Sequence, residues 1–484
     1  MTTTRTGHPS LADRRTRGND ARAATPPASH AGWAPAPDRA DPVGLLEEQN
    51  RTRDADLVPV RHRRMLASPF TFYRGAARIM AEDLWRTPTA GLTVQLCGDA
   101  HLSNFGVFGS PERSLVFDIN DFDETLPGPF EYDVKRLAAS FTVAARNNGF
   151  AKSDVQAVTR TAAASYRQAM AGFAEMRTLD LWYTQLSEKH IMKGMKQAAA
   201  ELSREGADEK TLAKQQKRAR QAVRKARERD SLQALAKLGE LVDGRYRIVS
   251  QPPFVVPLRD WATLYSAEAA GLGGDPDALI AAQLSAYGRT LQADRRQLLD
   301  RFEVVDAARK VVGVGSVGTR AFVVLLQGRD EEDPLFLQLK EASASVLESH
   351  LPRSRYRQPG QRVVEGQRMM QATSDIFLGW TRGADASRSY YWRQLRDMKG
   401  SAVVEVMKPG GMGFYAGMCG WTLARAHARS GDPVAIAAYL GDDDGFEVAM
   451  ADFGKRYAQQ NEQDYESFAD AVRSGRLEAA DEGS

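Results

Sequence analysis

A polar loop that follows a short apolar run constrains the fold of this chain more than any other feature. Residues 92–96 alternate apolar and polar side chains and read as a β-strand, and the polar loop occupies residues 97–106. A second apolar run, at 115–119, leads into the acidic segment 120–124. Polar loops that each follow a strand can converge on one spot, so we expect one site built from both loops.

The side chains of these two loops suit one particular chemistry. Phosphoryl transfer needs a carboxylate beside the acceptor hydroxyl, a neutral metal ligand and a carboxylate metal ligand. Asp99, Asn104 and Asp121 can supply these three groups in that order. Asp118 and Asp123 are alternative metal ligands. Because side chains alternate between the faces of a strand, Asp118 should point away from the side that Asp121 occupies.

The two loops together resemble the aminoglycoside phosphotransferase and choline kinase branch of the protein kinase-like superfamily. That branch carries H-G-D-x-H-x-x-N, then a strand ending in I-D-F or I-D-W, then D-L-A at the start of a helix. This chain reads C-G-D-A-H-L-S-N from Cys97, N-D-F from Asn120 and D-V-K-R-L-A from Asp133. A bacterial family of unknown function has the same G-D-x-H-x-x-N-F-G core. The chain departs from the pattern at Cys97, where the branch usually has a histidine that braces the loop.

This resemblance implies an α+β, protein kinase-like, two-lobed fold and a phosphotransferase that uses ATP and Mg²⁺. Asp99 would then be the catalytic residue, while Asn104 and Asp121 would hold the metal. His101 would brace the loop through backbone contacts, and it is also the rival for the catalytic role because histidine is the commonest general base. Asp133 would brace the loop through its backbone amides; the alternative is a simple helix-start acid.

A glycine-rich turn between β-like runs indicates where a nucleotide would bind. Residues 302–312 precede the G-V-G-S-V-G segment at 313–318, and apolar runs at 321–326 and 335–340 follow it. A lone G-x-G-x-x-G is a weak signal, but strand, glycine turn, strand, turn and a strand ending in lysine is the order of a kinase small lobe. The residues that would contact the nucleotide are Gly313, Gly315, Ser316, Gly318 and Lys340. The alternatives are a tight hairpin turn and an exposed edge lysine.

A kinase small lobe also needs a helix with a glutamate that pairs with this lysine. The amphipathic segment 361–370 offers Glu365, with Glu348 and Glu341 as alternatives. The simpler interpretation of Glu365 is a surface residue of the helix.

The order of the two motifs reverses the usual kinase order, in which the small lobe comes first. Either one motif is a false match or the lobes are circularly permuted, and we favour permutation because it is tolerated when chain termini lie close together at the surface. The expected organisation is a disordered tail at 1–43, a large helical lobe with the catalytic and metal loops at 44–300, a small β-rich nucleotide lobe at 301–400, and C-terminal helices at 401–484 that pack on the large lobe. The interspersed charges of 1–43 favour a solvated tail. The sequence further predicts helical structure at 44–90, one long helix at 131–175 and a helix at 412–429.

Composition narrows the partners and the location. The net charge of +3 gives no global basic field, so nucleic acid is not an expected partner, and the basic run at 210–229 is interpreted as a solvated helix face rather than a docking surface. No apolar run approaches the roughly 18–20 residues of a membrane span. The two cysteines exclude a disulfide framework and favour the cytoplasm. Cys97 is either a small buried residue or a reactive thiol, and Arg74 is either a ligand contact or a helix-surface arginine.

The expected function is therefore phosphoryl transfer from ATP to a small hydroxyl-bearing acceptor. The sequence identifies neither the acceptor nor the oligomeric state. Two other functions use the same fold: a nucleotide-binding, pseudokinase-like scaffold without transfer activity, and transfer of the nucleotidyl group to a protein.

Overall fold

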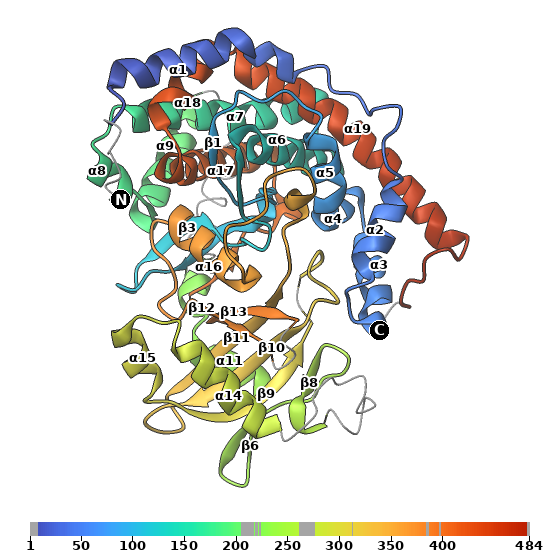
Figure 1. The fold of residues 1–484 in the computed structure, drawn as a ribbon, viewed down its shortest axis with the longest axis vertical. Helices are drawn as coiled ribbons and strands as arrows, with labels where there is room; N and C mark the ends of the chain where they lie inside the picture. The colour runs from blue at the N-terminus through green and yellow to red at the C-terminus, as the bar shows by residue number, and fades with distance from the viewer. Residues whose placement is uncertain are drawn as a thin grey trace, which may run out of the picture.

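The chain forms a helical lobe and a β-sheet lobe, which lie one above the other in Figure 1. The structure is a computed structural model, and it describes residues 8–204, 217, 221, 224–260, 276–311, 313–383, 387–395 and 398–481. The chain starts in the helical lobe, passes into the sheet lobe near residue 239 and returns to the helical lobe after residue 401. The result is a mixed α+β fold.

The N-terminal segment differs from its prediction as a disordered tail at 1–43. From residue 8 onward it folds, and its main element is α1 (Leu11–Ala24), which begins with a capping box between Ser10 and Asp13. Arg22 donates hydrogen bonds to the backbone oxygens of Tyr439 and Leu440, at 2.8 and 2.7 Å. The charges that suggested a solvated tail instead anchor α1 to the C-terminal helices.

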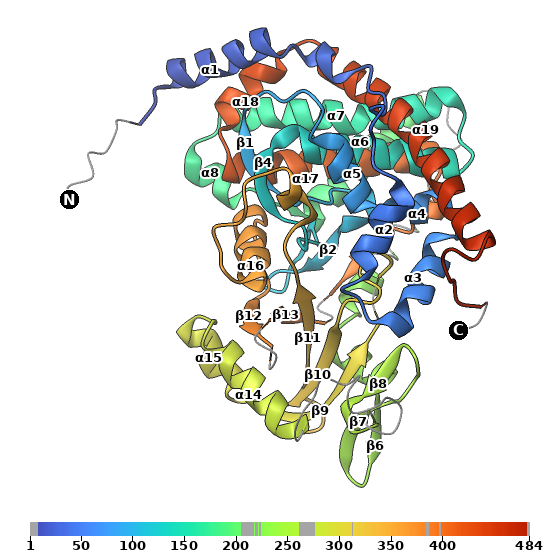
Figure 2. The ribbon, with the colours of Figure 1, turned by 45° about the vertical axis from the view of Figure 1, so that its right-hand side comes forward.

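Four further helices precede the polar loops, as the helical pattern of residues 44–90 predicts. They are α2 (Pro42–Asn50), α3 (Val58–Met65), α4 (Pro69–Gly75) and α5 (Ala77–Leu84). Figure 2 shows α2 and α3 reaching down from the helical lobe toward the sheet lobe. They thereby bring the N-terminal part of the chain to the boundary between the lobes.

Short strands carry the two polar loops. The first strand, β1 (Thr93–Leu96), pairs with β4 (Leu126–Pro129) in an antiparallel ladder. The second sheet has the order β14-β2-β3-β5, and its strands are β14 (Gly400–Ser401), β2 (Phe105–Gly109), β3 (Leu115–Ile119) and β5 (Leu186–Ser187). The loop at 97–104 therefore runs from β1 to β2, and the acidic segment runs from β3 to β4.

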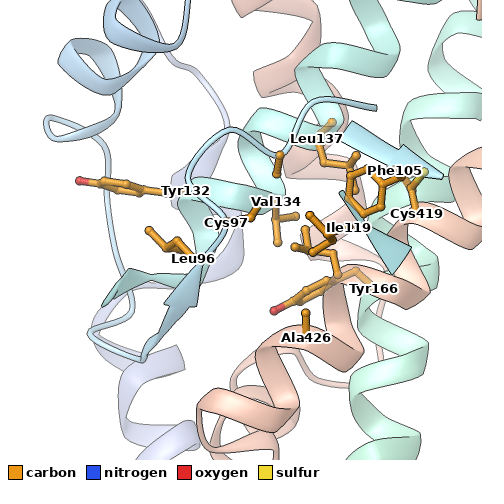
Figure 3. Close-up of a cluster of buried hydrophobic side chains, with 14 of the residues drawn as sticks. Leu96, Cys97, Phe105, Ile119, Tyr132, Val134, Leu137, Tyr166, Cys419 and Ala426 are labelled. Atoms are coloured by element: carbon orange, nitrogen blue, oxygen red, sulfur yellow. The ribbon is translucent and has the colours of Figure 1, made fainter. Parts of the chain in front are cut away.

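The helices behind these strands form the main core. The predicted single helix at 131–175 is two helices, α6 (Phe130–Asn147) and α7 (Lys152–Ala174), because Gly149 adopts φ 72° and ends the first. The returning chain adds α17 (Pro409–Ser430), α18 (Pro433–Leu440) and α19 (Gly445–Arg473). Gly420 of α17 lies so close to α7 that a Cβ there would meet the Ala162 carbonyl oxygen at 2.2 Å. Figure 3 shows side chains of α6, α7 and α17 packed against the strands and loops of the site.

Several shorter elements connect the lobes or cover the sheet. They are α8 (Thr178–Tyr183), α9 (Glu188–Arg204), α11 (Ser231–Leu238), α14 (Pro276–Gly288), α15 (Ala293–Leu299) and the hairpin of β6 (Gly239–Val242) and β7 (Arg245–Ile248). Within the basic run at 210–229, Arg224 pairs with Glu228 and Arg227 with Glu188. Lys210, Lys214, Arg218 and Arg220 of that run lie outside the described residues.

The sheet lobe is built on six antiparallel strands in the order β12-β13-β11-β10-β9-β8. They are β8 (Val255–Pro257), β9 (Glu303–Lys310), β10 (Ala321–Gln327), β11 (Pro334–Ala342), β12 (Gly379–Arg382) and β13 (Ser389–Gln394). Separate apolar clusters cover the two faces of this sheet. The helix α16 (Pro359–Met370) lies between the sheet and the helical lobe (Figure 1).

No helix among the described residues has the length and apolar character needed to cross a bilayer. This agrees with the absence of a long apolar run in the sequence.

Candidate functional site

A buried carboxylate holds the first polar loop in place. Asp133, in the first turn of α6, accepts hydrogen bonds from the backbone amides of Cys97 and Gly98 at 2.8 and 3.0 Å. His427 of α17 contacts the same carboxylate at 3.2 Å. Gly98 has φ 84°, and a Cβ at this position would meet the Glu124 backbone oxygen at 2.2 Å. Only glycine fits here, so the loop passes directly against the acidic segment.

The cysteine that replaces the usual histidine is a buried packing residue. Cys97 is 1% exposed and lies beside Val134 and Leu137 in the core shown in Figure 3. Burial raises the pKa of its thiol, and the nearby Asp133 carboxylate raises it further. A thiol held in its neutral form is a poor nucleophile, which argues against the reactive-thiol alternative.

Asp99 presents its carboxylate to the boundary between the lobes. Arg136 of α6 donates to Asp99 Oδ1 from Nε at 2.8 Å and from Nη2 at 2.7 Å. The second oxygen, Oδ2, lies 3.7 Å from His101 Nε2. The side chain is 20% exposed, so one carboxylate oxygen is fixed by an ion pair while the other is available to a ligand.

His101 lies beneath Asp99 and is nearly inaccessible. It is 4% exposed, and burial lowers its pKa to about 3 despite the neighbouring Asp99. Its backbone takes part in the loop: its amide donates to the Asp99 carbonyl and its carbonyl accepts from the Asn104 amide, at 2.8 and 2.9 Å. Because the ring is buried and neutral, and the main chain of His101 makes these hydrogen bonds, the residue suits a positioning role better than that of a proton acceptor for a substrate.

The two polar loops are joined by a backbone hydrogen bond. The Asn120 amide donates to the Asn104 carbonyl at 2.8 Å, which places Asp121 next to the first loop. Asn104 Nδ2 donates to the Asp99 carbonyl at 2.8 Å, and this leaves Asn104 Oδ1 as a free acceptor. Asp118 points the other way: it is 2% exposed and pairs with Arg425 of α17. The prediction that Asp118 points away from the side occupied by Asp121 is therefore confirmed.

The glycine turn lies against the N-terminal helices. Gly313 and Gly318 have positive φ values of 72° and 87°, and the Asp54 amide donates to the Gly318 carbonyl at 2.8 Å. A Cβ at Gly315 would meet the Arg74 backbone oxygen at 3.1 Å. The positive φ values favour glycine at 313 and 318, and the close approach to α4 leaves little room for a side chain at 315.

Lys340 occupies the centre of the sheet lobe, so the exposed edge lysine considered from the sequence is wrong. It lies on β11, between β10 and β13, and is 3% exposed. Its Nζ donates to Asp123 Oδ2 at 2.7 Å, and the Tyr391 hydroxyl donates to Asp123 Oδ1 at 2.7 Å. Burial lowers the pKa of Lys340, but the combined charges of Asp123, Tyr391 and Asp121 outweigh it, so the net shift is upward. The sheet lobe is thus joined to the acidic segment by an ion pair.

The glutamate expected to pair with Lys340 lies elsewhere. Glu365 contacts Arg368 on its own helix at 3.4 Å. Of the two alternatives, Glu341 pairs with Arg320 and Glu348 caps a short helix at Ser345. The buried face of α16 carries Arg362, which is 2% exposed, and Glu365 lies on a more exposed face of that helix.

Arg362 instead connects α16 to the acidic segment. It donates to the backbone oxygens of Thr125, Asp123 and Ser343 at 2.6, 2.7 and 2.8 Å. Sequence reasoning missed this arginine, as well as Arg136 and Tyr391. Strand register could have indicated Tyr391, because it stands directly opposite Lys340 in the β11–β13 ladder.

A cavity of about 660 Å³ brings the two motifs together. Asp99, Asp121 and Asp123 line it from the helical lobe, and Gly315 and Ser316 line it from the glycine turn. These groups are separated by about two hundred residues in the sequence. Of the other expected site residues, Lys340 reaches the cavity wall through its bond to Asp123. The residues that do not line the cavity are Asn104, His101, Gly313, Gly318 and Glu365.

The residues at this cavity suit magnesium better than a metal held by protein alone. No cluster of three or more His, Cys, Asp or Glu side chains that could bind a metal exists within the described ranges. Mg²⁺ needs fewer protein ligands than such a cluster provides, because it keeps several waters and binds one or two protein ligands plus phosphate oxygens. The Asp121 carboxylate lines the cavity and is an oxygen donor of this kind. Asn104 Oδ1 is a second such donor, on the neighbouring loop and outside the cavity lining.

Comparison with known proteins gives one match. A family described as "Uncharacterized protein conserved in bacteria (DUF2252)" matches residues 53–471. No curated protein and no solved structure matches the chain.

Proposed function

The chain belongs to this family of uncharacterized bacterial proteins, and we propose that it is an ATP- and magnesium-dependent phosphotransferase that acts on a small hydroxyl-bearing molecule. One observation carries the proposal: Asp99, Asp121 and the glycine turn line the same cavity, although they come from distant parts of the chain. We further propose that the fold is kinase-like with its two lobes circularly permuted. Such a fold would have both lobes and both motifs of a kinase, but its glycine turn would follow the catalytic loop in the sequence instead of preceding it.

The transfer itself assigns a role to each group at the cavity. The acceptor oxygen forms a bond to the γ-phosphorus, the bond from that phosphorus to the bridging oxygen breaks, and ADP leaves. The proton of the hydroxyl passes to Asp99, whose free oxygen orients the acceptor. Arg136 fixes the other oxygen and so holds the carboxylate in one orientation. The backbone of the glycine turn and Lys340 would bind the phosphates.

A magnesium ion at Asn104 and Asp121 would neutralise charge on the transferred phosphate. The contribution of the chain is to place two oxygen donors beside Asp99, which the backbone bond between Asn120 and Asn104 achieves. In the nucleotide-free state Lys340 is held by Asp123. Nucleotide phosphates would then have to compete with Asp123 for this lysine.

Because nucleotide phosphates must compete with Asp123 for Lys340, a nucleotide-binding scaffold without transfer activity is a second candidate function. A protein whose lysine stays paired with Asp123 would bind nucleotide without transferring a group. The third candidate, nucleotidyl transfer to a protein, would use the same fold and the same cavity. We place the protein in the cytoplasm, because its two cysteines are buried and free.

Mass spectrometry of the reaction with ATP and Mg²⁺ distinguishes these functions. The purified protein is incubated with ATP, Mg²⁺ and a mixture of hydroxyl compounds. The masses of the small-molecule products and of the protein itself are then measured. Added phosphate supports the proposal, added AMP assigns nucleotidyl transfer, and ATP binding without any product assigns the scaffold. The Asp99→Asn variant is the control for contaminating kinases, because its ATP affinity should remain while its product disappears.

A further inference from the structure

The cavity contains arginines that the proposed transfer does not use. Arg74, in the last turn of α4, lines the cavity beside Gly75 and is half-buried. Its Nε is buried without a hydrogen-bond partner among the described residues, and its guanidinium lies 5.9 Å from the centre of the Phe70 ring. Burial lowers the pKa of Arg74, while the charges of Glu405 and Asp99 raise it. A half-buried guanidinium whose Nε has no partner within the described part of the chain can donate its N–H groups to an anion in the cavity.

Two further arginines reinforce the positive charge at this wall. Arg53 also lines the cavity, where it donates to the Val317 carbonyl of the glycine turn and keeps a buried Nε without a partner among the described residues. Arg61 is fully buried behind the wall, and its hydrogen bonds go to neutral oxygens of Asn50, Gln49 and Gly75. Arginine stays charged in proteins, so this wall carries cations without a neighbouring carboxylate bonded to them.

Several acidic groups of the cavity are already engaged by other residues. Asp99 is paired with Arg136, Asp123 with Lys340 and Glu341 with Arg320. Glu124 accepts a hydrogen bond from the Val346 amide. The cavity is therefore lined by charges of both signs, and Arg53 and Arg74 are the lining arginines from α2 to the end of α4, where Glu48 also lies.

We propose that Arg74 and Arg53 bind an anionic group of the acceptor, so that the substrate is a hydroxyl compound that also carries a phosphate or a carboxylate. This inference rests on the proposed phosphotransferase function, since it names the substrate class of the same cavity. Guanidinium groups bind phosphate and carboxylate oxygens through pairs of parallel hydrogen bonds. Binding of such a group beside Asp99 would leave the hydroxyl of the acceptor close to the free Asp99 oxygen.

The position of Arg74 favours the acceptor over the nucleotide. Arg74 and Asp99 line the same cavity, so an anion held by Arg74 would lie in the cavity that also contains the carboxylate proposed to orient the hydroxyl. The nucleotide phosphates already have the glycine turn, Lys340 and the magnesium ligands. Arg78, the next arginine of this wall, is occupied by Glu82 at 2.8 Å and leaves the anion site to Arg74 and Arg53.

The experiment measures two affinities on the full chain by calorimetry. Inorganic phosphate, the probe for the anion site, is titrated into the protein with and without a saturating, non-hydrolysable ATP analogue and Mg²⁺. The analogue is titrated separately. The variants are Arg74→Gln, which removes the charge, and Arg74→Lys, which keeps it. Arg160→Gln is the matched control, because Arg160 lies on the exposed face of α7 and pairs with Asp444.

We expect Arg74→Gln to weaken phosphate binding by about tenfold or more, the effect of losing a charge-assisted hydrogen bond, and Arg74→Lys to recover part of it. Neither variant should change the affinity for the analogue, and Arg160→Gln should change neither affinity. Unaltered phosphate binding in Arg74→Gln overturns the anion site, and an equal loss of analogue affinity assigns Arg74 to the nucleotide and overturns the acceptor site. Phosphate binding that depends on Arg74 in a protein that binds no analogue would refute the phosphotransferase proposal alone.

Discussion

The ion pair between Lys340 and Asp123 makes a prediction that concerns stability as well as binding. Lys340 is 3% exposed and its Nζ lies 2.7 Å from Asp123 Oδ2. In Lys340→Met the aliphatic part of the side chain is kept, but Asp123 retains only the hydrogen bond from Tyr391. Removing one partner of a buried ion pair destabilises by about 3–5 kcal/mol. Because Asp123 is itself 28% exposed, water can replace part of the lost interaction, and we expect about 3 kcal/mol.

Urea unfolding followed by circular dichroism measures this change, and the double variant Lys340→Met/Asp123→Asn tests its cause. Once both charges are absent, no carboxylate is left unpaired. The double variant should therefore lose less unfolding free energy than the two single variants lose together, by about 1 kcal/mol or more. Lys237→Met is the matched control: Lys237 is an exposed residue of α11, and its replacement should change stability by less than about 0.5 kcal/mol. A Lys340→Met variant as stable as the wild type, or strictly additive losses, would refute the reasoning.

Four further predictions address the cavity and its surroundings. Asp99→Asn should lower turnover by about 10²–10³-fold with little change in ATP affinity, because the carboxylate acts on the acceptor proton; full turnover in this variant would contradict its role. Glu365→Gln should leave the ATP affinity measured by calorimetry unchanged, since Lys340 is held by Asp123. A large loss of ATP affinity would instead support the Glu365–Lys340 pair expected from the sequence. Burial raises the pKa of Glu124 from 4.5 to about 7, so the folded state holds a proton that the unfolded chain has lost. Stability should therefore fall as the pH rises from about 4.5 to about 7, and Glu124→Gln should reduce that slope in urea titrations at several pH values; an unchanged slope would contradict the assignment. Iodoacetamide should label Cys97 and Cys419 only after unfolding, because both thiols are buried, and labelling of the native protein detected by mass spectrometry would contradict their burial.

Much of the local structure could be predicted from the sequence because it depends on periodicity. The apolar run at 321–326 is part of β10, and the segment at 412–429 lies within α17. The break between α6 and α7 was missed, although Gly149 and its positive φ end the first helix. A single glycine in a long apolar pattern gives a weak signal, because glycine is also tolerated inside helices.

The contacts that build the site were less predictable, because they depend on which face of an element turns inward. The sequence offers Glu365 and Arg362 on the same helix, three positions apart, and only packing decides that Arg362 is the buried one. The same holds for Lys340, whose partner Asp123 was considered as a metal ligand rather than as an ion-pair partner. The prediction of a disordered N-terminal tail was wrong for a related reason. Arg22 donates a hydrogen bond to a residue more than four hundred positions away, and no local sequence pattern indicates such a contact.

The close packing of α17 on α7 has a consequence for how the protein is made. The ribosome synthesises the polar loops and α6 to α7 early, but the helix that covers α7 emerges only after the whole sheet lobe. Until then, the face of α7 around Ala162 and the Asp133 carboxylate, which His427 later contacts, lack their partners. The apolar face of the nascent segment with the polar loops therefore stays uncovered until the last helices of the chain are synthesised. A product that stops before α17 would carry the complete set of polar loops and yet be a substrate for chaperones and proteases rather than a working protein.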